Sequence, residues 1–200
     1  IDDSAGTPLT ETPPGIFLRL TARLFHEGVA PVPLLAVLKH PLAAGGESTA
    51  AFRASTRVLE RLVLRGPRPA RGFAGLRAAA ELRFRQAREA ATTGQSNGHS
   101  NDLEKCDDAE ELIQRLMAFA APVDDLLDKP AAMLPDIVTA HVVFCEALAT
   151  SDVLSGAERL WVDEAGEALA AFVSELLEFG GGLGPVAPDR YPALLDALLA

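Results

Sequence analysis

The sequence has little that would tie the chain to a membrane, a disulfide framework or a structural zinc ion. Only two cysteines, Cys106 and Cys145, occur among the 200 residues, and their spacing fits neither a disulfide scaffold nor a zinc motif. No apolar run approaches the roughly 18 residues of a membrane-spanning helix. The N-terminus is acidic, whereas a secretory signal begins with basic residues. We therefore expect a protein of the reducing cytoplasm.

Motifs that bind nucleotides or perform catalysis are also missing. No Gly-Lys pair occurs anywhere, which excludes the Walker phosphate loop. Neither Pro135-Asp136 nor Pro188-Asp189 is followed by the Glu-x-Lys of a nuclease site. The glycines of segment 180–184 follow a predicted helix rather than a strand, which favours a helix cap and linker over a dinucleotide loop. We expect no catalytic residue, no cofactor and no metal ion in this segment.

Two groups of side chains nevertheless invite a chemical interpretation. His141 and Cys145 lie one helical turn apart and could share a metal ion, but Val142, Val143 and Phe144 between them favour core packing. Paired carboxylates are frequent, and adjacent carboxylates on a helix point in different directions. We interpret them as a solvated face; they are Asp107-Asp108, Glu110-Glu111, Asp124-Asp125 and Asp163-Glu164.

What the sequence does contain is a helical pattern along its whole length. Apolar residues make up 48% of the chain and recur at spacings of three and four, while no stretch alternates convincingly between apolar and polar residues. Thr12 and Pro13 predict one helix start, and Ser48 or Thr49 and Ser155 predict two more. The expected fold class is all-α, with helices after Pro13, over 34–39, 49–65, 73–90, 102–120, 137–149 and 156–179, and from Pro188 onward.

Composition divides the chain into two helical halves that together are expected to form one domain. Residues 1–91 form a basic half and residues 102–200 an acidic half, and the Thr, Gly, Ser and Asn of 92–101 predict a flexible linker. Split at Ser100, the first part has 13 basic and 8 acidic residues (net +5). The second has 5 and 20 (net −15), which together give the net charge of −10.

Arginine is concentrated in the basic half. Ten arginines lie between Arg53 and Arg88, against only Glu60 and Glu81. Four of them recur every four residues and form a slowly drifting stripe along one helix, namely Arg53, Arg57, Arg61 and Arg65. Like charges at this spacing repel unless an anion or an acidic surface faces them. The stripe is either a solvated or internally paired face or a phosphate-binding surface. The candidate DNA contacts are Arg53, Arg57, Arg61, Arg65, Arg68 and Arg71.

The ends of the sequence suggest a piece of a longer chain. The only methionines are Met117 and Met133, so Ile1 is not a natural start, and the last residues form an apolar helical stripe without a cap. We expect the parent to extend beyond both ends.

Several stretches carry a resemblance to a known family. They are residues 1–9, Thr12-Pro13-Pro14-Gly15 with 17–20, residues 33–42, 72–77 and 156–161, and Tyr191-Pro192-Ala193-Leu194-Leu195. The first 42 residues carry the most specific part of the match, and the linker matches weakly. In these strings the chain resembles AddB, the nuclease subunit of the bacterial AddAB helicase-nuclease, in its alphaproteobacterial type.

The resemblance implies a place within a DNA-repair machine. Members of that family have a helicase-like region without a working ATPase site, followed by a nuclease domain, and a motor subunit, AddA, works beside them on double-strand DNA ends. This segment would correspond to the helical accessory (2B-type) domain of the superfamily-one helicase-like part. The nuclease carboxylates and iron–sulfur cysteines of the family belong elsewhere, and neither Cys106 nor Cys145 matches such a motif. The implied role is a brace along the DNA path.

A different class of protein would share the all-α fold. The alternative is a free-standing module for ligand binding or dimerisation, such as the effector domain of a transcription regulator. Its distinguishing feature would be a preceding helix-turn-helix, or an apolar pocket with a few polar groups between helices. The sequence reveals neither, and an independent enzyme is the least supported class.

Overall fold

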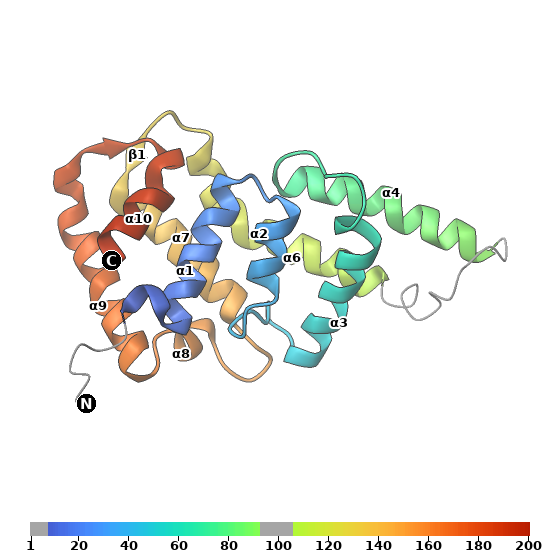
Figure 1. Ribbon diagram of the computed structural model, residues 1–200, viewed down its shortest axis with the longest axis horizontal. Coiled ribbons are helices and arrows are strands. Elements are labelled where there is room, and N and C mark those ends of the chain that lie inside the picture. The colour runs from blue at the N-terminus through green and yellow to red at the C-terminus, as the bar shows by residue number, and fades with distance from the viewer. Residues whose placement is uncertain (1–7, 93–105) are drawn as a thin grey trace.

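Helices make up nearly all regular structure in the computed structural model, which describes residues 8–92 and 106–200 (Figure 1). The all-α expectation is confirmed. The helices are α1 (Pro13–His26), α2 (Pro31–Leu38), α3 (Thr49–Leu59), α4 (Gly72–Thr92), α6 (Cys106–Leu127), α7 (Leu134–Ala149), α8 (Gly156–Leu160), α9 (Asp163–Phe179) and α10 (Tyr191–Leu199). The 3₁₀ turns are η1 (Leu9–Glu11), η3 (Gly180–Leu183) and η4 (Pro188–Arg190), and η2 (Glu60–Leu64) is π-helical.

Three predicted helix starts are confirmed because they depend on local hydrogen bonds. The Thr12 hydroxyl accepts a bond from the Gly15 amide at the start of α1, with Pro13 as the first helical residue. Ser48 caps α3 in the same way. Ser155 and Glu158 form a reciprocal capping box at the start of α8.

The helices predicted over 34–39 and 137–149 each begin three residues earlier, at Pro31 and Leu134. Two other predicted boundaries are wrong by more. Helix α6 does not end at Ala120 but continues through Pro122 to Leu127, since the proline lies on an exposed side while Val123 remains buried in the core. The single helix predicted over 156–179 is broken into α8 and α9 at Trp161 and Val162. The break is stabilised by a distant contact, in which the Trp161 indole donates to Glu146 of α7.

Two very short strands complete the described elements. β1 (Ala132–Met133) pairs antiparallel with β2 (Pro185–Val186), with Ala132 opposite Val186. Strands of two residues are too short to show alternation, so the sequence pattern does not predict them. They join the segment that precedes α7 to the one that precedes α10.

Helix α6 runs through the middle of the molecule and connects its two ends (Figure 1). It packs against α3 and α4 from the basic half and against α7 from the acidic half, while α1 contacts α2, α7, α9 and α10. One hydrophobic cluster includes residues from both halves, and its largest fully buried side chains include Phe17, Phe52, Phe84 and Phe144. The predicted linker lies outside the described residues except for Thr92, the last residue of α4.

Among the helices of residues 8–92 and 106–200, none is both long enough and apolar enough to cross a membrane.

Candidate functional site

The arginine stripe begins on α3 and continues through the π-helical turn η2. Four residues overshoot one turn of an α-helix, so a four-residue repeat drifts around the helix axis. In a π-helix the hydrogen bonds span five residues and the turn is wider, so the same repeat falls short of one turn. The π-helical turn at Glu60–Leu64 therefore opposes the drift of the stripe that an uninterrupted α-helix would give. The side chains of Arg57, Arg61 and Arg65 are exposed.

Arg53, the first arginine of the stripe, is engaged inside the fold. Its two terminal nitrogens donate to the carbonyls of Leu38 and His40, each at 2.8 Å. Leu38 is the last residue of α2, where helical acceptors lack partners, and His40 lies two residues beyond it. Partial burial lowers the pKa of Arg53, and the guanidinium ties α3 to α2. The structure thus gives Arg53 a packing role.

Arg65 and Arg68 differ in their charge partners. Arg65 lies 3.0 Å from a carboxylate oxygen of Glu60, which also pairs with Lys39 at 2.7 Å. These hydrogen bonds, first that of Lys39 and then that of Arg65, lower the pKa of Glu60. Arg68 is exposed in the loop between η2 and α4, and Arg57 is exposed on α3. Within the described part of the chain, neither Arg57 nor Arg68 makes an ion pair or side-chain hydrogen bond.

Ion pairs between the two halves neutralise other basic residues. Arg88 near the end of α4 pairs with Asp107 at 2.6 Å and with Glu110 at 3.1 Å, and Arg115 pairs with Glu47. These pairs connect the two halves beside the stripe rather than on it. Internal pairing therefore accounts for Arg88 but not for Arg57 or Arg68.

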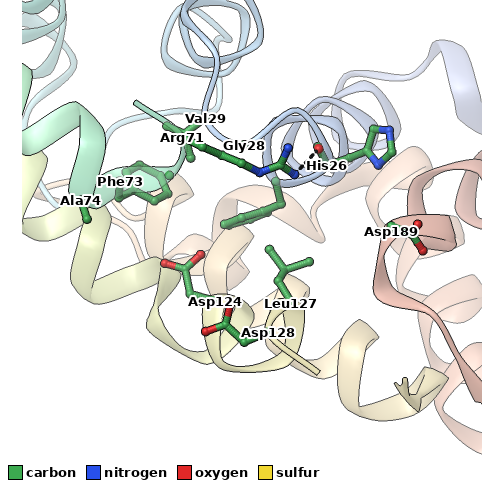
Figure 2. Close-up of a pocket in the computed structure, with 12 residues that line it drawn as sticks. His26, Gly28, Val29, Arg71, Phe73, Ala74, Asp124, Leu127, Asp128 and Asp189 are labelled. Carbon is green, nitrogen blue, oxygen red and sulfur yellow. Dashed lines mark hydrogen bonds between the residues drawn. The ribbon is translucent and has the colours of Figure 1, made fainter. Parts of the chain in front are cut away.

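Arg71 lies apart from the stripe, at a pocket of about 460 Å³. Its Nη2 donates to the carbonyl of His26 at 3.0 Å, at the end of α1. The pocket lies between the end of α1, the start of α4 and the last turn of α6, with Asp189 of η4 at its edge (Figure 2). Phe25, Phe73 and Leu127 supply apolar surface, and Asp124, Asp128 and Asp189 supply carboxylates.

The carboxylates on α6 differ in exposure. Asp125 is exposed, as the solvated-face interpretation predicts, but Asp124 is only partly exposed and lines the pocket. Burial raises the pKa of Asp124, and the charges of Asp128 and Asp125 raise it further. The predicted helix ended at Ala120, before these residues. Only the extension of α6 to Leu127, beside the end of α1 and the start of α4, reveals which carboxylate faces a pocket.

His141 and Cys145 lie in the core, as their apolar neighbours predict, and they join a buried polar cluster. The Tyr191 hydroxyl lies 2.9 Å from His141 Nδ1, and Thr21 Oγ1 lies 2.7 Å from His141 Nε2. The Thr21 hydroxyl also lies 3.1 Å from the Cys145 sulfur. Burial lowers the pKa of His141 to about 4 and raises that of Cys145 to about 12. No pattern in the sequence indicated that Thr21 and Tyr191 would contact His141, because the three residues come from distant helices.

No group of three or more His, Cys, Asp or Glu side chains within 8–92 and 106–200 is arranged to hold a metal ion. His40 is nearly buried, stacks on Phe17 and accepts a bond from the Leu42 amide, whereas His26 is exposed at the pocket. His99 lies outside the described residues. Gly180 follows the end of α9, and the glycine run forms the short turn η3, as a cap and linker predicts.

Comparisons with protein-family models, with curated proteins and with solved structures found no match. The resemblance to AddB therefore stays a prediction from the sequence.

Proposed function

We propose that this chain is a non-catalytic helical segment of an AddB-like subunit and contacts DNA phosphates through exposed arginines. In the parent complex an AddA-like subunit would supply the motor, and the segment would brace the DNA during processing of double-strand ends. The observation that carries the proposal is the pair of exposed arginines, Arg57 and Arg68, without anionic partners in the described structure. Arginines that are exposed and unpaired bind phosphates with little loss of existing contacts.

Within this proposal the six candidate arginines separate into two groups. Arg57, Arg61, Arg65 and Arg68 form the proposed phosphate face, because all four side chains are exposed. Arg53 and Arg71 already donate to backbone carbonyls, Arg53 through both terminal nitrogens. Arg53 supports the fold beside the phosphate face, and Arg71 lies apart from it at the pocket.

A charge-reversal experiment on the isolated chain tests this face. The double variant R57E/R68E is compared with K129E/R190E, which changes the net charge equally but lies in the acidic half. Binding to a fluorescently labelled DNA duplex is measured by anisotropy at several salt concentrations. Loss of two phosphate contacts is expected to weaken binding at least tenfold and to reduce the salt slope by about 2.

The control double variant is expected to bind within about twofold of the wild type. Equal losses of DNA affinity in both double variants would show a general charge effect and contradict the proposal. So would the absence of measurable DNA binding by the wild type at low salt. In the parent complex, deletion of the segment is expected to abolish end processing. Unchanged processing after deletion would contradict the assignment to the repair machine.

The pocket at Arg71 favours a second candidate function, the free-standing ligand-binding module. It combines apolar surface from Phe25, Phe73 and Leu127 with a few charged groups, and its volume of about 460 Å³ lies in the range of small-molecule sites. Binding of a small molecule in this pocket, detected by amide shifts of its lining residues, would support that function.

A further inference from the structure

The pocket has one wall of carboxylates. Asp124 lies in the last turn of α6 and Asp128 directly follows the helix. The Asp128 amide donates to the Asp124 carbonyl at 3.3 Å, which continues the helical turn and leaves the two side chains on the same side. Like charges at this spacing repel, and the carbonyl end of a helix adds a partial negative charge. Neither carboxylate makes an ion pair within the described residues. A cation between the two carboxylates would relieve their mutual repulsion.

The opposite wall carries a positive group in a fixed position. The Arg71 side chain crosses the backbone at Gly28, where an added Cβ would lie 2.4 Å from Arg71 Cγ. Gly28 has a φ of 64°, so both its conformation and its lack of a side chain suit this crossing. One bond to the His26 carbonyl holds the guanidinium and leaves further N–H donors for an anion.

The two walls face each other across apolar surface. Figure 2 shows the Arg71 guanidinium on one side of the pocket, with Asp124 and Asp128 across from it and Leu127 beside them. Phe25 and Phe73 add apolar surface to the lining of the pocket. Three carboxylates with one guanidinium disfavour a polyanion, so this pocket is not an extension of the proposed phosphate face.

We propose that the pocket binds a small zwitterion, with its carboxylate on Arg71, its ammonium group between Asp124 and Asp128, and an apolar chain between them. The inference rests on the second candidate function and names its ligand class. A ligand with only one charged end would leave one wall without a counter-ion. The zwitterion supplies a counter-ion to the charged groups of both walls, and its apolar chain covers the apolar surface.

Calorimetric titration with ε-aminocaproate tests the ligand class. Caproate lacks the ammonium group and hexylamine lacks the carboxylate, so each is expected to bind at least tenfold more weakly. The variants D124N and R71Q are each expected to weaken ε-aminocaproate binding at least tenfold. D124N removes a repulsive charge and is expected to fold, and D108N, on the exposed first turn of α6, is the matched control and is expected to bind as the wild type does.

Amide shifts in an NMR titration locate the ligand and separate the outcomes. Shifts centred on the ends of α1 and α6 and the start of α4 support the proposal. Hexylamine binding there as tightly as ε-aminocaproate would overturn the zwitterion but keep the ligand-binding function. If none of the three compounds binds, the zwitterion is overturned, whereas the second candidate function fails only if no small molecule shifts the amides of the pocket.

Discussion

Acidification is expected to destabilise the fold through His141. The ring is buried, with 1% of its surface exposed, and both nitrogens have partners. The Thr21 hydroxyl can donate to the carbonyls of Phe17 and Leu18, so we assign the N–H of His141 to Nε2 and the acceptor role to Nδ1. Nδ1 then accepts from the Tyr191 hydroxyl. Protonation of Nδ1 would remove this acceptor and place a charge in the core.

The size and sign of the effect follow from the two pKa values of His141. Burial lowers the pKa from 6.5 in an unperturbed histidine to about 4 in the fold. Between these values the unfolded chain binds the proton and the folded chain does not, so the free energy of unfolding decreases as the pH falls. The stabilisation that neutral His141 contributes to the free energy of unfolding is complete above pH 6.5. It decreases at lower pH, and roughly 3 kcal/mol of it is lost by about pH 4. That loss is a large part of the stability of an average domain.

Urea denaturation between pH 7.5 and 4.5 measures this loss. The variant H141Q cannot titrate, so its stability is expected to fall less steeply with acid than that of the wild type. His40 has a pKa that burial first, and then the charge of Arg53, lowers to about 4, so H40Q is a necessary second comparison. Equal pH dependence in the wild type and H141Q would refute this account of the core. NMR titration of the native His141 ring gives an independent check, with protonation expected only near pH 4.

Two further substitutions test packing that the sequence does not reveal. Y191F removes the donor to His141 Nδ1 and is expected to lower the free energy of unfolding by about 1–3 kcal/mol, measured by urea denaturation, with L198F on an exposed face of α10 as a control near zero. G156A places a Cβ 1.7 Å from the Glu146 carbonyl oxygen and is expected to cost about 3 kcal/mol or more by the same assay. G182A, in open space, is its control, and similar stabilities for the two glycine variants would contradict the close approach of α8 to α7.

The sequence predicted the features that depend on neighbours along the chain. The caps at Thr12, Ser48 and Ser155 bind amides three residues away, so their spacing is visible in the sequence. The break at Trp161 depends on Glu146, 15 residues earlier, and the continuation of α6 through Pro122 depends on packing of its last turn. Periodicity describes one face of one helix and contains no information about which distant helix covers it.

The same limit applies to the candidate sites. Arginine spacing placed Arg53 and Arg57 on one stripe, but Arg53 turns to two carbonyls near the end of α2 while Arg57 is exposed. The pocket combines residues from 25–29, 71–74, 124–128 and 189, so no local pattern could indicate it. The sequence shows which residues are charged, whereas the fold determines which charged side chains lie close together.

The distribution of charge places a constraint on the proposed DNA contact. Helix α9 carries five acidic residues and no basic one, and it lies at the opposite end of the molecule from α3 (Figure 1). A DNA duplex would be repelled by α9 and attracted by Arg57 and Arg68, so the charge distribution favours orientations that bring these arginines rather than α9 toward the DNA. The acidic half would therefore add direction to the contact rather than affinity. Neutralising acidic residues of α9 is expected to strengthen DNA binding without rescuing R57E/R68E, because nonspecific attraction does not replace the two guanidinium groups.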